Sequence, residues 1–303
     1  MIRSILSDFC SLSGQIPNQD KSSILFSKNV NQPTQDEIRN IFPVKILDSS
    51  TNHLGHPLLF SHKDKSKAYN FVHQKFRVKL TTVKANKINH VGRLIYINSV
   101  LASIPVYYIA TILFPKTFTD KITTIIRRFW RAGVQEGEQT NHIAFRSWED
   151  ICQPKDKGGL GVRDIHMVNK SLIIHSACKI AAAHDALLTA ILKAKYYPNN
   201  SFWTTPVHGT KSVFWASILK VKHHLRQNCS YQIHQGTTNI WNQPWCPIWE
   251  QIHSHLNLPV SHHPLPNTVA DLWRPNSQNW NTQLITNIFF TACCQRHFAG
   301  SYC

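Results

Sequence analysis

The chain has 303 residues and a mass of 34.8 kDa, which is enough for about two domains with a hydrophobic core. Its 33 lysines and arginines against 16 acids give a formal net charge of +17, which predicts an anionic partner, either nucleic acid or an anionic membrane surface. With 42% hydrophobic and 11% aromatic residues, the composition excludes a disulfide-stapled miniprotein and a wholly disordered basic protein.

The first 60 residues predict two short helices and two short strands. Apolar side chains of residues 2–10 share one helical face, and residues 23–26 are strand-like. A capping box at 34–37 predicts a helix that ends before Pro43. A second strand-like run spans residues 54–60, and a proline within it restricts that run to an edge or a bulge.

The segment 63–93 is the most basic part of the sequence. It carries nine lysines and arginines and one acid, Asp64, which gives a charge of +8. Its apolar residues fit helical spacing, so we predict a basic amphipathic helix with its charge on the outer face. A run of positive charge without compensating acids can be either a phosphate-binding surface or an ordinary solvated face, and the sequence does not decide between them.

A nearly apolar run, 94–114, follows and is long enough to span a membrane. We interpret it as a buried helix because it contains Asn98, Ser99 and Pro105 and lies between basic helices, so no membrane is predicted. The eight cysteines are scattered and the first residues lack an apolar signal region, which indicates a cytoplasmic or nuclear chain rather than a secreted one.

The second half of the sequence predicts more helices. Residues 120–130 form an amphipathic pattern, Asp164 is positioned to cap a helix, and another helix is expected over 181–192. Segments 230–233 and 238–241 predict a hairpin. Residues 186–249 contain no acid, and six cations predict a second basic surface there: Lys193, Lys195, Lys211, Lys220, Lys222 and Arg226.

Catalytic chemistry is weakly signalled. Adjacent acids occur at 36–37 and 149–150, and both pairs are interpreted as charges at helix starts, so we predict no two-metal polymerase centre and no catalytic residue. The glycines of 158–161 could cradle a phosphate, but the Gly-Lys-Ser/Thr ending is missing. A hydrolase triad assembled in space stays open. A zinc site is a further alternative, although the spacing of its candidate ligands matches no common zinc finger. These ligands are Cys293, Cys294, His297 and Cys303.

Several short blocks follow one another along the chain: LGHP (54–57), FPK (114–116), IIRRFW (125–130), GGLGVRD (158–164), KAKYYP (193–198) and FWASILK (214–220). As a set and in this order, they resemble the reverse transcriptase of plant non-LTR retrotransposons, the LINE-like elements, in the part that follows the catalytic aspartates. The likeness covers about residues 1–285.

The resemblance implies an α+β fold, predominantly helical. A truncated palm remnant with a few short strands would precede a helical thumb-like bundle and a helical connection with a C-terminal hairpin. The corresponding ranges are 1–61 for the palm end, 62–135 for the thumb-like region, 136–210 for the connection, 211–288 for the helix and hairpin before the zinc-binding module, and 289–303 for a divergent tail.

In the parent family, the resemblance implies, this segment holds the template-primer backbone. Mg²⁺ belongs to the parent enzyme, and no cofactor is expected in this chain. Neutralising about five phosphates would give a log K versus log salt slope of roughly −4 to −5. The candidate nucleic-acid-binding residues are Leu54, Gly55, Lys75, Lys79, Lys84, Lys87, Arg93, Arg127 and Arg128.

The functional hypothesis is a truncated, catalytically inactive reverse transcriptase-like protein that binds RNA or DNA through backbone phosphates. Two alternatives stay open. The chain could belong to an active RNA-directed DNA polymerase whose aspartates lie upstream, or it could be a non-functional pseudogene product without a stable fold. The oligomeric state is not predicted.

Overall fold

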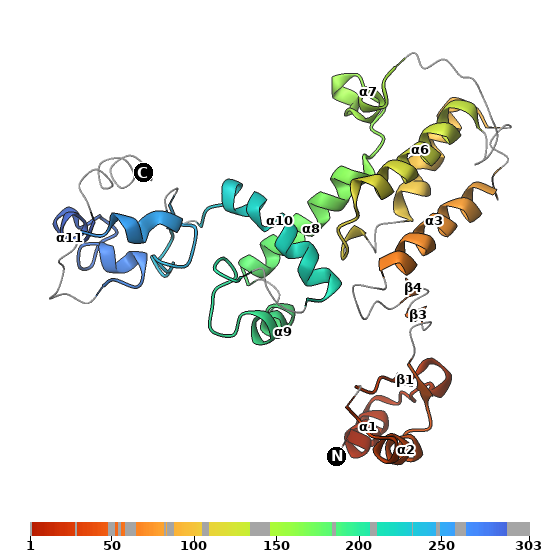
Figure 1. Ribbon diagram of the computed structural model, residues 1–303, viewed down its shortest axis with the longest axis horizontal. Helices are drawn as coiled ribbons and strands as arrows, with labels where there is room; N and C mark the ends of the chain where they lie inside the picture. The colour runs from red at the N-terminus through yellow and green to blue at the C-terminus, as the bar shows by residue number, and fades with distance from the viewer. Residues whose placement is uncertain are drawn as a thin grey trace. The chain divides into compact units, whose positions relative to one another are not determined.

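The computed structural model describes residues 2–27, 29–47, 52–53, 56–57, 65–81, 83, 88–104, 109–133, 146–183, 186–206, 211–231, 233–246, 249–257 and 265–289 (Figure 1). The chain divides into two compact units, Met1–Gln74 and Lys75–Cys303. In the described part helices dominate and strands are short, so the predicted helix-rich α+β class is confirmed.

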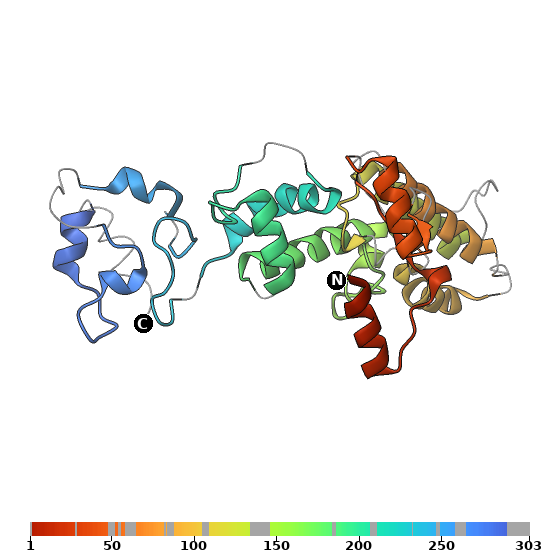
Figure 2. The same cartoon turned by 90° about the horizontal axis from the view of Figure 1, so that it is seen from below.

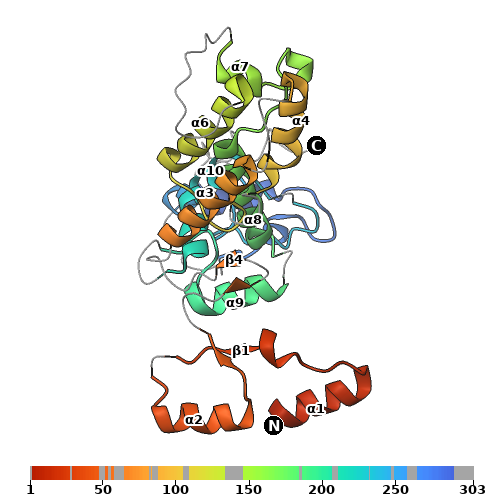
Figure 3. The ribbon, with the colours of Figure 1, turned by 90° about the vertical axis from the view of Figure 1, so that its right-hand side faces the viewer.

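Unit 1 combines two helices with a minimal parallel sheet (Figure 3). α1 spans Ile2–Ser13 and α2 spans Gln32–Ile41. β1, Ser23–Ile24, pairs in parallel with β2, Lys45–Ile46. Parallel strands need a crossover connection, and the segment containing α2 supplies it.

Two expectations for unit 1 need correction. α2 begins before the capping box at 34–37, because the side chain of Asn31 accepts the Thr34 backbone N–H at 3.0 Å and caps the helix one turn earlier. The run 54–60 does not form one strand from its start, since β3 (Asn52–His53) pairs antiparallel with β4 (His56–Pro57). The other residues of that run lie outside the described ranges.

The basic segment 63–93 forms two helices instead of the single helix expected. α3 spans Lys65–Thr81 and crosses the boundary between the units, and α4 spans His90–Ser99. The Asn89 side chain accepts the Gly92 backbone N–H at 2.8 Å and so starts α4 afresh.

The apolar run 94–114 is not one buried helix. After α4 comes a short 3₁₀ turn, η4 (Leu101–Ser103), and residues 110–115 form turns and an irregular stretch that leads into α6 (Lys116–Ala132). Residues 105–108 of the run lie outside the described ranges. No helix in the described ranges is long and apolar enough to cross a membrane.

Buried Asn169 holds this irregular stretch in place. Its Oδ1 accepts the Phe114 backbone N–H at 2.9 Å, and its Nδ2 donates to the carbonyls of Ile109 and Ile112 at 2.7 and 2.8 Å. Asn169 itself is 0% exposed. Since one side chain satisfies three backbone groups, the apolar chain can leave helical geometry inside the core.

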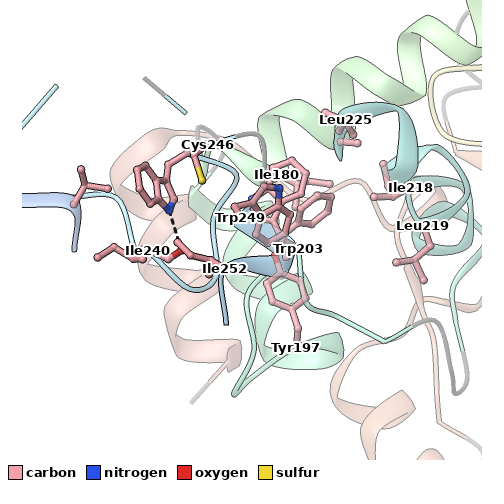
Figure 4. Packing of buried hydrophobic residues seen from close by; sticks show 14 of the residues in the cluster. Ile180, Tyr197, Trp203, Ile218, Leu219, Leu225, Ile240, Cys246, Trp249 and Ile252 are labelled. Atoms are coloured by element: carbon pink, nitrogen blue, oxygen red, sulfur yellow. Dashed lines mark hydrogen bonds between the residues drawn. The ribbon is translucent and has the colours of Figure 1, made fainter. Parts of the chain in front are cut away.

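The main core of unit 2 forms around α8 (Ile165–Ala181) and α10 (Val213–Asn228), which pack against each other (Figures 1 and 2). Asp164 caps α8 as predicted, accepting the Met167 backbone N–H at 3.1 Å. The helix expected over 181–192 is α9, Ala186–Tyr196. Figure 4 shows part of the aromatic-rich core, which includes Tyr197, Trp203, Ile218, Leu225 and Trp249.

The predicted hairpin has the wrong partner. The backbone N–H of Ile240 donates to Asn267 at 3.0 Å and that of Val269 donates to Thr238 at 3.0 Å, so the segment after the Gly236 turn pairs with residues 267–269. The segment 230–233 does not take that place among the described residues. The remaining short helices of the described residues are η1 (Gln19–Lys21), α7 (Trp148–Cys152), η5 (Lys155–Lys157), η6 (Trp249–His255), η7 (Val269–Leu272) and α11 (Thr282–Ile288).

Candidate nucleic-acid interface

The C-terminal half of α3 presents a basic outer face. Phe76 and Leu80 are 0% and 6% exposed and anchor the inner face. Lys75, Arg77 and Lys79 are exposed, as is the apolar Val78, and α3 contains no acid. Burial of the apolar residues thus fixes which way the cations point.

α6 is arranged in the same way. Its inner face carries Ile122, Ile126 and Phe129, which are between 1% and 3% exposed. Arg128 is exposed and Arg127 is half-buried. The helix begins after Pro115 and ends at a left-handed Gly133.

Tyr96 of α4 joins these two basic helices. Its hydroxyl donates to the Lys79 backbone carbonyl at 2.9 Å, and its ring centroid lies 5.6 Å from that of Phe129. Lys79 and the Arg127–Arg128 pair are therefore brought to one region of unit 2. Across the described part of residues 75–133 there is one acid, Asp120, and the cations are Lys75, Arg77, Lys79, Arg93, Lys116, Lys121, Arg127, Arg128 and Arg131.

Arg93 has a structural task in this region. Its Nε donates to the Ile88 carbonyl at 3.0 Å, and its Nη1 donates to the carbonyls of Trp130 and Arg131 at 3.3 and 3.4 Å. A cation at the last turn of α6 satisfies carbonyls that the helix leaves open and complements the helix dipole. The guanidinium of Arg93 thus fastens α4 to the end of α6.

Four of the candidate residues, Leu54, Gly55, Lys84 and Lys87, lie outside the described ranges. The described candidates lie on three helices of unit 2: Lys75 and Lys79 on α3, Arg93 on α4, and Arg127 and Arg128 on α6. α4 contacts α3 through the Tyr96–Lys79 hydrogen bond and α6 through the Arg93–Trp130 hydrogen bond. Arg77 and Lys121 share the exposed faces of the same helices and were not singled out. Their helical phase relative to Phe76 and Ile122 was a signal available in the sequence.

The second basic surface predicted over 186–249 needs correction. Lys222 is only 5% exposed, and its Nζ donates to the Thr205 carbonyl at 3.2 Å and lies 5.5 Å from the Phe202 ring centroid. Burial and, to a smaller extent, the positive charge of nearby Arg226 lower the pKa of Lys222 from its ordinary 10.5 to about 8, while Glu250 opposes the shift. Lys222 belongs to the core because α10 turns it inward.

Arg226 is likewise engaged, although it is partly exposed. Its Nε lies 3.2 Å from Glu250 Oε1, its Nη2 donates to the Trp203 carbonyl, and its guanidinium lies 6.0 Å from the Trp249 ring centroid. An arginine held by these contacts keeps α10 against η6. Of the other lysines of the predicted surface, Lys193, Lys195 and Lys220 are exposed and Lys211 is half-buried.

The glycine-rich turn at 158–161 uses its own amides internally. The backbone N–H of Gly159 donates to Pro154 at 3.1 Å, that of Leu160 to Ile151 at 3.0 Å, and that of Gly161 to Gln153 at 3.0 Å. Amides already bonded to carbonyls do not point at a phosphate, so this turn is structural.

The paired acids have separate explanations. Glu149 and Asp150 lie in the first turn of α7 (Trp148–Cys152), as expected, and the Ser147 hydroxyl accepts the Asp150 N–H. Asp36 is not at a helix start, because α2 begins at Gln32, and it lies 3.7 Å from Arg39 instead. No group of three or more metal-ligating side chains occurs in the described ranges, and the candidate zinc ligands of 293–303 lie outside them.

Fold and site together define a helix-rich α+β protein with a basic helical face. No family model matches the chain. It is similar to the Arabidopsis thaliana protein named "Putative ribonuclease H protein", with 32% identity over 135 residues, and to an uncharacterized mitochondrial protein of that plant, with 28% identity over 145 residues.

The coverage of these two relatives differs. The first alignment takes in 43% of this chain and 21% of the relative, and the second takes in 47% of this chain and 92% of the relative. The chain thus has plant homologues, and it spans about a fifth of the length of the longer one.

Proposed function

We propose that this chain is a transposon-derived, reverse transcriptase-like protein of the non-LTR class. In this proposal it binds the phosphate backbone of RNA or DNA through the basic face formed by α3 and α6. The plant homologues support the transposon origin, and the order of the sequence blocks supports the reverse transcriptase assignment. The proposal places the chain in the cytoplasm or the nucleus.

The observation that supports phosphate binding is the segregation of positive charge around Tyr96. Lys75, Lys79 and Arg128 are exposed, whereas Phe76, Leu80 and Phe129 beside them are buried. Among the described residues from 75 to 133, one acid accompanies nine cations. Cations held on rigid helices neutralise phosphates and release counterions without reading base sequence. Binding should therefore be independent of sequence and of Mg²⁺.

Salt-dependent binding to a fluorescent oligonucleotide tests this proposal. We expect the intact chain to bind duplex and single-stranded probes, with affinity falling steeply between 50 and 200 mM salt. Changing Lys75, Lys79, Arg127 and Arg128 together to glutamine should reduce the magnitude of the log K versus log salt slope by about 3 to 4 on duplex DNA, since each lost phosphate contact removes about 0.9.

A second quadruple variant controls for net charge. Lys157, Lys179, Lys193 and Lys220 are exposed cations on other elements of unit 2, and their change to glutamine removes the same charge. We expect this variant to retain most of the slope. Equal losses in both variants, or no binding by the unaltered chain at 50 mM salt, would show that the α3–α6 face is not the binding surface.

A further inference from the structure

Two cysteines meet where the C-terminal ends of α8 and α10 lie together. Cys178, in the last turn of α8, is half-buried, and Cys229, the residue after α10, is exposed. The side chain of Cys229 is near enough to that of Cys178 to raise its pKa. They are 51 positions apart in the sequence, so the packing of α8 on α10 creates the pair.

The surroundings hold both thiols in place. The Tyr231 hydroxyl donates to the Ala181 carbonyl at 2.6 Å, which ties the chain just after Cys229 to the end of α8. The Trp203 indole N–H in turn donates to the Tyr231 hydroxyl at 3.4 Å. The Cys229 backbone N–H donates to Leu225 at 2.8 Å and fixes the exit from α10. Disulfides form readily where the backbone already brings two cysteines together.

Access to the pair comes from one side. Cys229 lines a cleft of about 670 Å³, together with His223, Arg226 and Glu250. A small oxidant can therefore reach Cys229 directly. Burial raises the pKa of Cys178, and neighbouring Cys229 raises it further, so the exposed thiol is the one that oxidant meets first.

We propose that Cys178 and Cys229 form an oxidation site, in which a peroxide joins them as a reversible disulfide that locks α8 to the end of α10. The Cys229 thiolate attacks hydrogen peroxide and becomes a sulfenic acid, releasing hydroxide. The Cys178 thiol then displaces the sulfenic oxygen, which leaves as water. Two thiols and one peroxide thus yield one disulfide and two waters.

Peptide mapping of the folded full chain tests the site. After treatment with a small excess of hydrogen peroxide and alkylation of free thiols, trypsin should yield the peptide 171–179 linked to the peptide 227–296, because trypsin does not cleave the Arg274–Pro275 bond. The second peptide also contains Cys246, Cys293 and Cys294, so fragmentation of the linked peptides in the mass spectrometer should assign the bond to Cys229. Cys246 is 5% exposed and lines the same cleft. The Cys246→Ser variant should give the same linkage, whereas Cys229→Ser should abolish it.

Thermal unfolding supplies an independent measurement. A bond closing a loop of about 50 residues is expected to raise the melting temperature of oxidised Cys246→Ser by about 5 to 10 °C, and dithiothreitol should reverse the rise. Cys152→Ser is the matched control and should behave as the unaltered chain. Recovery of Cys178 as a free thiol after peroxide treatment, or its linkage to any cysteine other than Cys229, would overturn the proposal.

Discussion

Replacing Asn169 with alanine should destabilise unit 2 far more than an average substitution does. Three backbone groups, the Phe114 N–H and the carbonyls of Ile109 and Ile112, would lose their partner inside the core. Each unsatisfied buried group costs about 1 to 3 kcal/mol, and water entering the vacated space would offset part of the sum. We expect a loss of about 3 to 5 kcal/mol from the free energy of unfolding.

Tryptophan fluorescence during urea unfolding measures this loss selectively. All nine tryptophans of the chain lie within Lys75–Cys303, so the signal reports on unit 2 and not on unit 1. For a unit of this size, a loss of 3 to 5 kcal/mol corresponds to a melting temperature lower by about 8 to 15 °C. The same transition tests whether the chain folds cooperatively, which a pseudogene product without a stable fold would not.

Two further variants sharpen the interpretation. Asn169→Asp keeps the shape and the acceptor but sets a carboxylate against two carbonyls, so its destabilisation should lessen as the pH falls and the acid becomes protonated. Asn287→Ala, at an exposed position of α11, should change stability by less than about 0.5 kcal/mol. A loss below 1 kcal/mol in Asn169→Ala would refute the bridging role.

Three more predictions, at Lys222, at Gly159 and at Asp164, are measured by the same urea unfolding experiment. The pKa of buried Lys222 is lowered from 10.5 to about 8, so the unfolded chain binds more protons than the folded chain between these pH values. The free energy of unfolding, relative to that of Lys222→Met, should therefore rise by up to about 3 kcal/mol from pH 8 to 10.5. A difference that does not change with pH would contradict the buried charge. Gly159→Ala should lower the free energy of unfolding by about 2 to 4 kcal/mol, because the added Cβ would collide with the Gln153 backbone. Gly158→Ala, with open space around it, should lower it by about 1 kcal/mol through the positive φ of Gly158. Equal losses in the two variants would show that the turn rearranges to accept the Cβ. Asp164→Ala should lower the free energy of unfolding by about 1 kcal/mol through loss of the α8 cap, while Asp164→Asn should keep most of the cap's contribution. If both variants were as stable as the unaltered chain, the cap would be unimportant.

Local signals in the sequence were sufficient for several elements. Asp164 caps α8 because a short acceptor side chain beside free N–H groups needs only its own turn. The amphipathic pattern of 120–130 similarly specifies a helix and its buried face, including Phe129. These features depend on neighbours three or four residues away, which a reader of the sequence can count.

Features that depend on distant partners were not readable in the same way. The apolar run 94–114 looked like one helix, and its irregular end depends on Asn169, 55 residues beyond Phe114. The hairpin prediction had the turn but not the partner, because residues 267–269 compete for the same backbone groups. A local pattern cannot show which of two segments wins such pairing.

The sequence by itself determined that this chain is basic, mostly helical and rich in amphipathic helices, because composition and periodicity are properties of short windows. Only the tertiary structure decided which cations face solvent: Lys79 and Arg128 do, Lys222 is enclosed, and Arg93 holds the end of α6. The physical reason is that burial and hydrogen bonding are set by the packing of segments far apart in the chain. Charge alone does not say whether a lysine meets a phosphate or a carbonyl.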